Sequence, residues 1–114
     1  MPIKEPITFE DFSKIDIRVG EIVAAEPFDN VKTPAYKVWV DFGDEIGIKK
    51  SSAQITACYE ADELVGKQVL GVVNFPPKQI KNFMSEVLVL GIYASQGVVL
   101  IQPEQPVKKG DKLG

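Results

Sequence analysis

The sequence predicts an all-β domain: an OB-fold, which is a five-stranded Greek-key barrel, with a short N-terminal helix, one inserted helix and a C-terminal extension. Three observations lead to this prediction. Short segments alternate apolar and polar side chains, turn residues separate them, and one helical segment lies between the third and the fourth strand. This order of elements is typical of the OB-fold. The 114 residues contain no linker and no repeat, so we expect a single domain over 1–114, with its core in about 9–114.

The first predicted element is a short helix that begins after Thr8. Thr8 can act as the N-cap, and Asp11 stands three residues later, in the position of a capping-box acid. The helix must be brief, because strand-like alternation starts at Ile15. In the strand that follows, apolar residues occupy odd positions up to Val19 and even positions after Gly20. A glycine at such a phase change predicts a β-bulge there, which would bend the strand as a barrel requires.

The next two strands are predicted to form an antiparallel hairpin. Tyr36, Val38, Val40 and Phe42 alternate with Lys37, Trp39 and Asp41, and residues 46–50 return after the short turn 43–45. The segment that follows leads into a helix over 59–64, which Gly66 ends.

The second half of the chain contains three more predicted strands. The first of them, 68–74, is apolar on both faces. It ends at Pro76 and Pro77, because proline cannot continue the hydrogen-bond ladder. The remaining segments follow in order: a polar and basic connection (78–85), a fifth strand (86–93), a sixth strand (98–102) and an irregular tail (103–114).

The composition argues against most enzymes. The chain has no histidine and a single cysteine, Cys58, so it can form neither a Ser–His nor a Cys–His catalytic pair. For the same reason it cannot assemble a metal site of thiolates and imidazoles, and it has no glycine-rich phosphate-binding motif. A buried, inert thiol is the simplest role for Cys58. We therefore expect a non-enzymatic binding protein without a metal or a cofactor.

The expected location is the cytoplasm. The N-terminal residues contain no apolar signal segment. No run of the chain approaches the roughly 18 apolar residues of a membrane-spanning helix, so we expect no membrane insertion. A single cysteine, which cannot form an internal disulfide, fits a reducing compartment.

Charge is distributed unevenly along the chain, although the formal net charge is only −3. That net charge excludes a uniformly basic protein that coats nucleic acid, but it does not exclude a local basic face. Residues 1–31 hold three basic side chains and seven acids, whereas 46–59 and 64–85 hold lysines and no acid. If the third strand lies beside the connection after the fourth, these lysines form one basic face, where OB-folds bind oligonucleotides. The alternative is an ordinary solvated surface.

Two other kinds of ligand contact have candidates in the sequence. Stacking on bases would need exposed aromatic side chains, and binding of polypeptides would need an exposed apolar groove. For every candidate, packing onto its own barrel is the competing interpretation. The stacking candidates are Trp39, Phe75, Phe83 and Tyr93. The candidates for the apolar groove are Phe75, Pro76, Pro77, Ile80, Phe83 and Met84.

Several blocks of the sequence resemble the family of tRNA-binding OB domains. Asp16–Ile22 (DIRVGEI) is similar to the opening strand of those domains. They are appended to bacterial methionyl-tRNA synthetases and to phenylalanyl-tRNA synthetase β chains, and they also occur alone. Three further blocks are more similar still to the CsaA-type branch of export-related chaperones: Ile46–Thr56, Val72–Pro77 and Ser85–Gly91. The resemblance covers the chain from Phe9 to Gly114.

This resemblance implies a homodimer of OB barrels, with the N-terminal helix and the C-terminal tail in the subunit contact. It implies unfolded or pre-secretory polypeptides as ligands and the export ATPase SecA as a further partner. The tRNA-binding relatives make tRNA the alternative ligand. One departure favours the chaperone branch, because Val87-Leu88 stand where the tRNA-binding relatives usually have Gly-Met. A third interpretation is a subunit that recruits a synthetase or an export factor. No residue of the sequence distinguishes this interpretation from a polypeptide-binding chaperone.

The candidate residues for binding nucleic acid or peptide combine the basic segments with polar and aromatic residues of the resembling blocks. No catalytic and no metal-binding residue is expected, and Arg18 is expected to be a structural residue of the first strand. The candidate binding residues are Lys49, Lys50, Ser52, Asn74, Phe75, Lys78, Lys81, Ser85 and Glu86.

Overall fold

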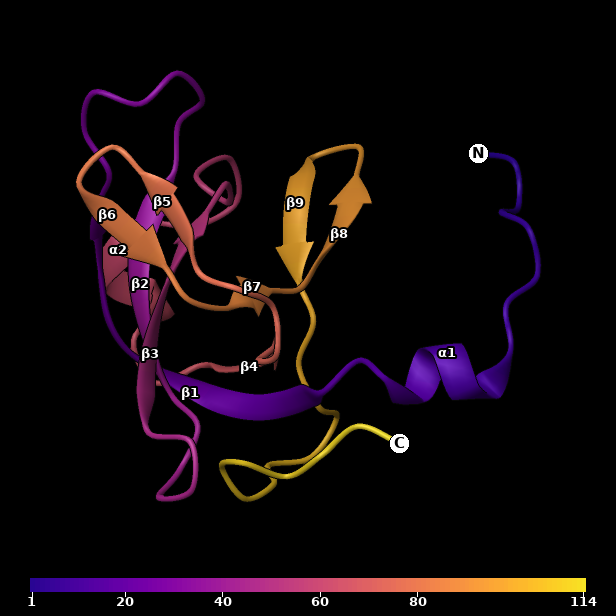
Figure 1. Cartoon of the computed structure of the whole chain (residues 1–114). Coiled ribbons are helices and arrows are strands. Elements are labelled where there is room, and N and C mark those ends of the chain that lie inside the picture. Colours follow the sequence, from indigo (N-terminus) through magenta and orange to yellow (C-terminus); the bar gives the residue numbers. More distant parts are fainter.

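Five antiparallel strands form a nearly closed barrel in the computed structural model, which describes residues 1–114 (Figure 1). Their order in the sheet is β3-β2-β1-β4-β7. The OB-like barrel predicted from the sequence is thereby confirmed. The strands of the barrel are β1 (Ile17–Pro27), β2 (Tyr36–Asp41), β3 (Ile48–Ala53), β4 (Gln68–Val72) and β7 (Leu88–Val89). Two hairpins and two helices complete the fold: β5 (Lys78–Ile80) with β6 (Phe83–Ser85), β8 (Gly91–Ala94) with β9 (Gly97–Leu100), α1 (Phe9–Ser13) and α2 (Ala61–Leu64).

The barrel core explains why these segments become strands. Along β2, Tyr36, Val38 and Val40 are buried, whereas Lys37 and Trp39, which alternate with them, lie on the other face. Burial of apolar surface contributes about 25 cal/mol per Å², which makes this side of the sheet the main source of stability. The eleven buried side chains of the barrel core are Ile22, Tyr36, Val38, Val40, Phe42, Ala53, Ile55, Leu64, Val69, Val87 and Leu100.

The first strand has the predicted β-bulge, but the bulge is not at Gly20. The register of β1 against β2 shifts between Ile22 and Ala24, which leaves Val23 as the extra residue. Gly20 serves packing instead, because a Cβ atom added there would lie 2.4 Å from Cγ1 of Val40. Glycine is favoured both at a bulge and where two chain segments approach closely. The sequence alone therefore could not show which of the two explains Gly20. The first half of β1 pairs with β4 and the second half with β2.

Three segments differ from their predicted form. Residues 51–53 continue β3 instead of starting a connection, and residues 78–85 form the hairpin β5–β6 instead of an irregular loop. The predicted strand 86–93 is divided, because β7 pairs with β4 whereas β8 pairs with β9. The change of partner lies at Gly91, where an added Cβ atom would lie 2.5 Å from Cγ1 of Val98. Alternation of side chains shows that a segment is extended but not which strand it pairs with.

The inserted helix α2 lies between β3 and β4, as predicted, and buries Leu64. It is shorter than the predicted helix over 59–64. Gly66 follows it with a φ of 94°, which glycine adopts without strain. No helix of the structure is long and apolar enough to cross a membrane.

An N-terminal arm, residues 1–14, leaves the barrel and carries α1 (Figure 1). The predicted capping box is confirmed: Oγ1 of Thr8 accepts the backbone N–H of Asp11, and the Asp11 carboxylate accepts that of Thr8. β1 begins at Ile17, two residues later than the alternation predicts. No residue of α1 is buried, so the arm contributes nothing to the barrel core.

The tail, residues 103–114, contains no regular element, as predicted, but it is bound to β1. The N–H of Val19 donates to the carbonyl of Asp111 (2.9 Å), and the N–H of Gly110 donates to the carbonyl of Val19 (2.8 Å). The tail therefore covers an edge of the first half of β1 that would otherwise be open to other strands.

Candidate functional site

Lysine and aromatic side chains share the outer face of β2 and β3. In the register of the two strands, Lys37 pairs with Ser52 and Trp39 pairs with Lys50. Directly paired residues of antiparallel strands project from the same face of a sheet. Because the intervening residues of β2 fill the barrel core, this face is the outer one. We call these four residues the β2–β3 face.

The hairpin β5–β6 packs on the β2–β3 face through Phe83. The ring of Phe83 lies edge-on to two other rings, with its centroid 6.1 Å from that of Trp39 and 5.3 Å from that of Phe28. Phe28, Ala35 and Phe83 are buried together and form a second, smaller cluster, which we call the hairpin core. Aromatic pairs in this arrangement contribute about 0.5–1.5 kcal/mol beyond the area they bury. The hairpin is therefore anchored on the face.

Two lysines of the β2–β3 face lie against the rings of the hairpin core. Nζ of Lys37 is 4.9 Å from the ring centre of Phe28 and 5.3 Å from that of Phe83. Nζ of Lys50 is 5.3 Å from the ring centre of Phe83. Such cation–π contacts contribute about 0.5–1 kcal/mol each at exposed sites. Neither lysine takes part in an ion pair, so both ammonium groups are held in place while their hydrogen-bond donors are free for an oxygen of a ligand.

A polar hollow of about 470 Å³ adjoins this face, between the loop after β1 and the turn of the hairpin β5–β6. Asn30 on the loop and Lys81 on the turn both have a positive φ, of 62° and 56°. Residues other than glycine adopt this conformation uncommonly, and such residues gather at functional sites. The hollow is lined by Glu26, Pro27, Phe28, Asp29, Asn30, Lys37, Lys81 and Asn82.

Some of the predicted binding residues meet on this surface. Lys50 and Ser52 belong to the β2–β3 face, and Lys81 lines the hollow beside it. Lys78 is exposed on β5. Lys49 is half-buried and projects from the opposite face of β3 to its neighbour Lys50. Of the lysines expected on one basic face, the structure therefore brings Lys50 and Lys81 to this surface, whereas Lys49 points away from it.

Ser85 and Glu86 instead hold the barrel together at its open edge. Oγ of Ser85 accepts the N–H of Ser52 (3.1 Å). The N–H of Glu86 donates to the carbonyl of Lys50 (2.8 Å), and Oε1 of Glu86 accepts the N–H of Lys50 (3.1 Å). These bonds join β3 to the end of β6 and to the residue that follows it. Both side chains thus have partners within the barrel, on the strand that carries the β2–β3 face.

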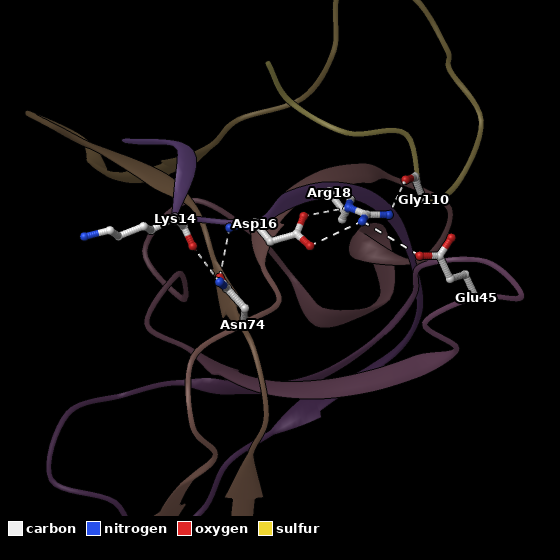
Figure 2. Close-up of polar contacts among 6 residues, drawn as sticks. All are labelled: Lys14, Asp16, Arg18, Glu45, Asn74 and Gly110. Carbon is white, nitrogen blue, oxygen red and sulfur yellow. Dashed lines mark hydrogen bonds and ion pairs between the residues drawn. The ribbon is translucent and has the colours of Figure 1, made fainter. Parts of the chain in front are cut away.

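Asn74 lies in a separate polar cluster at the start of β1 (Figure 2). Oδ1 of Asn74 accepts the N–H of Asp16 (2.9 Å), and Nδ2 donates to the carbonyl of Lys14 (2.7 Å). Arg18 donates to the Asp16 carboxylate through Nε (2.6 Å) and Nη2 (3.2 Å), and through Nη1 to the carbonyl of Gly110 (3.2 Å). The hydrogen bond to Asp16 raises the pKa of Arg18 above its ordinary value, because it stabilises the charged form. These contacts support the structural role expected for Arg18.

The apolar groove expected for a polypeptide is only partly present. Phe83 is 6% exposed and the half-buried Ile80 packs beside it, so for these two residues the alternative of packing onto the barrel holds. The reason is that the hairpin turns their side chains toward Phe28. Phe75 is 49% exposed and Met84 is 39% exposed, so both remain available to a ligand.

Sequence reasoning missed Lys37, Asn30 and Asn82. Lys37 lies outside the two acid-free segments, so a count of charges by segment passed over it. Its alternation with the buried residues of β2 was the signal that could have placed it beside Trp39. Asn30 and Asn82 come from two loops far apart in the sequence, and no local pattern shows that such loops meet.

The comparisons with known proteins agree with this fold. Residues 17–112 match the family model of the putative tRNA binding domain. The chain is 38% identical over 108 residues to a methionine–tRNA ligase of Methanococcoides burtonii, covering 94% of this chain and 16% of that protein. It is 36% identical over 115 residues to the ligase of Parabacteroides distasonis, covering 98% of this chain and again 16% of that protein. The chain thus spans about a sixth of the length of these relatives.

Three solved structures match along the whole length of their chains. A CsaA chaperone protein from Picrophilus torridus is 55% identical with a TM-score of 0.91, and chaperone CsaA from Bacillus anthracis is 45% identical with a TM-score of 0.90. Each match covers 96% of this chain and 100% of the other. A protein from Pyrococcus horikoshii related to methionyl-tRNA synthetase is 27% identical with a TM-score of 0.85, over 97% of this chain and 100% of that one. The chain therefore belongs to the tRNA-binding domain family, and CsaA chaperones are among its structural neighbours.

Proposed function

We propose that this protein is a non-enzymatic, homodimeric chaperone of the CsaA type, which binds unfolded or pre-secretory polypeptides in the cytoplasm. One observation carries the proposal: the chain matches the full length of a CsaA chaperone at 55% identity, but only 16% of a methionine–tRNA ligase. The similarity therefore extends over the whole solved chain of the CsaA chaperone and over one part of the ligase.

The β2–β3 face and its hollow offer an unfolded polypeptide the contacts that it needs. The ammonium groups of Lys37 and Lys50 can donate to backbone carbonyls of an extended chain, and the Asn30 and Asn82 amides can both donate and accept. The exposed side chain of Met84, on the hairpin, is flexible and suits varied apolar side chains. Polar groups around a small apolar surface are the expected character of such a site.

The N-terminal arm supports the homodimer. Ile7 is 69% exposed and Phe9 is 78% exposed, although both belong to an apolar type that normally finds a partner. An isolated helix as short as α1 is marginal in water, so contact with another surface would stabilise it. A second copy of the chain would supply that surface, and two binding faces on one dimer would increase the avidity for a long polypeptide.

A chaperone assay tests the proposal. Chemically denatured luciferase is diluted into buffer with the purified protein, and its aggregation is followed by light scattering. We expect suppression near one dimer per client. The variant Lys37→Ala/Lys50→Ala should need about thirtyfold more protein, because the two lost cations together remove about 2 kcal/mol of contact. The matched control Lys67→Ala/Lys108→Ala removes the same charge elsewhere and should behave like the wild type. No suppression at a large excess of wild-type dimer would overturn the chaperone function.

Binding of tRNA is the second candidate function, favoured by the family that residues 17–112 match. Lys37, Lys50 and Lys81 lie around one surface, as contacts to a phosphate backbone require. Neither residue of the departure at Val87-Leu88 belongs to the β2–β3 face or lines the hollow: Val87 is buried in the barrel core, and Leu88, 45% exposed, pairs with Val72 of β4.

A gel shift with total tRNA measures this second candidate on the same protein. If tRNA is the ligand, the affinity falls with salt, and each lost phosphate contact flattens the slope of log affinity against log salt by about 0.9. The variant Lys37→Ala/Lys50→Ala/Lys81→Ala should therefore bind more weakly with a flatter slope. Absence of binding at low salt, together with suppression of luciferase aggregation, would leave the chaperone function alone.

The export ATPase SecA is the partner that we propose for an export role, on the strength of the similarity to CsaA chaperones. Purified SecA passed over the immobilised dimer should be retained. Failure of SecA to bind, beside an active chaperone assay, would separate polypeptide binding from protein export. Recovery of a single stoichiometric partner from lysate, with no client binding, would instead support a recruiting subunit.

A further inference from the structure

The amide of Asn74 spans the root of the N-terminal arm (Figure 2). Its oxygen accepts the N–H of Asp16 at 2.9 Å, and its nitrogen donates to the carbonyl of Lys14 at 2.7 Å. The N–H of Val73 donates to the carbonyl of Asp16 at 2.9 Å. Together these three bonds continue the pairing of β1 with β4 beyond the last paired residues of the two strands. They fix the direction in which the chain leaves the barrel.

Beyond this root, the arm forms hydrogen bonds only within itself. Thr8 and Asp11 bond each other, Ser13 bonds the carbonyl of Phe9, and the N–H of Ile15 donates to Phe12. No polar contact of residues 1–13 reaches the barrel. The orientation of the arm relative to the barrel therefore depends on the bonds at its root.

The same root is tied to the tail. The Asp16 carboxylate takes two hydrogen bonds from Arg18, whose Nη1 donates to the carbonyl of Gly110. Nη2 of Arg18 also lies 3.9 Å from Oε1 of Glu45, in the turn between β2 and β3 (Figure 2). One arginine thus connects the start of β1, the tail and that turn.

We propose that Asn74 is a positioning residue for self-association: it aims the N-terminal arm, so that the apolar side chains of the arm reach a second copy of the chain. The inference rests on the homodimer of the proposed function. Asparagine suits this place because it offers one donor and one acceptor to a backbone N–H and carbonyl two residues apart. Aspartate would present an oxygen to the Lys14 carbonyl and would add a second negative charge beside Asp16.

The test compares dimer dissociation constants, measured by sedimentation equilibrium on the full chain. Asn74→Ala removes both bonds, and Asn74→Asp keeps the acceptor and loses the donor. Loss of hydrogen bonds of this kind should raise the dissociation constant by about tenfold for Asn74→Ala and by a smaller factor for Asn74→Asp. The control Gln54→Ala removes an exposed amide that has no hydrogen bond in the structure, and it should leave the constant unchanged.

A second pair of variants separates positioning from a general loss of structure. Ile7→Ser/Phe9→Ser alters only exposed side chains of the arm and should weaken the dimer without changing the unfolding midpoint of the monomer. In this background, Asn74→Ala should add no further weakening, because the arm that it aims no longer binds. Equal weakening by Asn74→Ala in both backgrounds would overturn the positioning role.

The remaining outcomes are distinguishable. A wild-type dimer that Asn74→Ala leaves unchanged overturns this inference and leaves the proposed homodimer standing. A wild-type protein that stays monomeric up to high concentration overturns the homodimer and the inference together. If Asn74→Ala does not fold, Asn74→Asp answers the same question, since it retains the bond to the Asp16 N–H.

Discussion

The barrel core and the hairpin core are built from similar side chains but differ in their surroundings. Phe42, Ile22 and Val40 of the barrel core are completely buried, and the strands enclose them on all sides. Phe28 and Phe83 of the hairpin core are nearly as buried, but two ammonium groups lie about 5 Å from their rings. An aromatic ring that is enclosed by other apolar side chains contributes only stability. A ring in cation–π contact with lysines also holds their ammonium groups in place near the solvent. Substitutions in the two clusters should therefore have different consequences.

The largest effect is expected in the barrel core. Phe42→Ala should lower the free energy of unfolding by about 3–5 kcal/mol, because it removes a fully buried ring and leaves a cavity. Urea unfolding measures this change. Phe75→Ala, at a half-exposed position, is the control and should change stability by less than about 0.5 kcal/mol. Equal losses for the two variants would contradict the enclosed core.

The tight packing of the barrel core gives the second prediction. Gly20→Ala should destabilise the protein by about 1–3 kcal/mol, because the new Cβ atom meets Val40 and Phe42. In the background of Val40→Ala, which opens space at this point, the added cost of Gly20→Ala should be smaller. The four proteins of this cycle are compared by urea unfolding. Strict additivity would show that the glycine is not needed for this close approach.

Phe83→Leu is the most direct test of the difference in role between the hairpin core and the barrel core. It keeps an apolar side chain but removes two edge-to-face ring pairs, so stability should fall by about 1–3 kcal/mol, less than for Phe42→Ala. It removes the ring that holds Lys37 and Lys50, so binding to denatured luciferase should weaken about threefold to tenfold. Phe42→Leu, the matched change in the barrel core, should reduce stability and leave binding unchanged in the folded protein. A binding loss in both variants would erase the distinction between the clusters.

The smallest effect is expected at the polar edge of the barrel core. Tyr36 donates a hydrogen bond to the carbonyl of Tyr59 at 2.7 Å, so Tyr36→Phe should destabilise the protein by about 1 kcal/mol at neutral pH. Burial raises the pKa of Tyr36, and Glu60, Glu63 and Asp62 raise it further. Its contribution to stability is therefore complete below the ordinary tyrosine pKa of about 10 and is lost as the pH rises through the raised pKa.

This pH dependence is measured by urea unfolding of the wild type and of Tyr36→Phe at several alkaline pH values. The difference in stability between the two proteins should shrink as the pH increases. A constant difference across the alkaline range would show that Tyr36 does not titrate with unfolding.

The strands of the barrel were predictable because each buries one face. The alternation over 36–42 predicts β2 almost to the residue, since every second side chain there enters the barrel core. The hairpin β5–β6 was not predictable by the same rule, because its strands are short and its turn contains no glycine. Lys81 takes the positive φ that glycine would favour, so the usual signal for the turn is absent.

The sequence predicts which kinds of side chain form the candidate site, but not which individual residues belong to it. Lys50 and Ser52 are two residues apart on β3, so both lie on the β2–β3 face. Lys49 is the neighbour of Lys50 and therefore points to the opposite face. Asn74 and Glu86 were chosen as polar residues of resembling blocks, and the structure gives both of them partners within the chain. Residue type shows what a side chain can bond, but only the fold decides whether a neighbour already takes that bond.

The bulge at Val23 has a consequence for how the molecule folds. Because β1 is shared between β2 and β4, its partners lie at very different distances along the chain, and the bond from Arg18 to Gly110 joins residues 92 positions apart. Closing a longer loop loses more chain entropy before any contact compensates for it. We therefore expect the hairpin of β2 and β3 to form early, and the docking of β1 with the tail to set the folding rate.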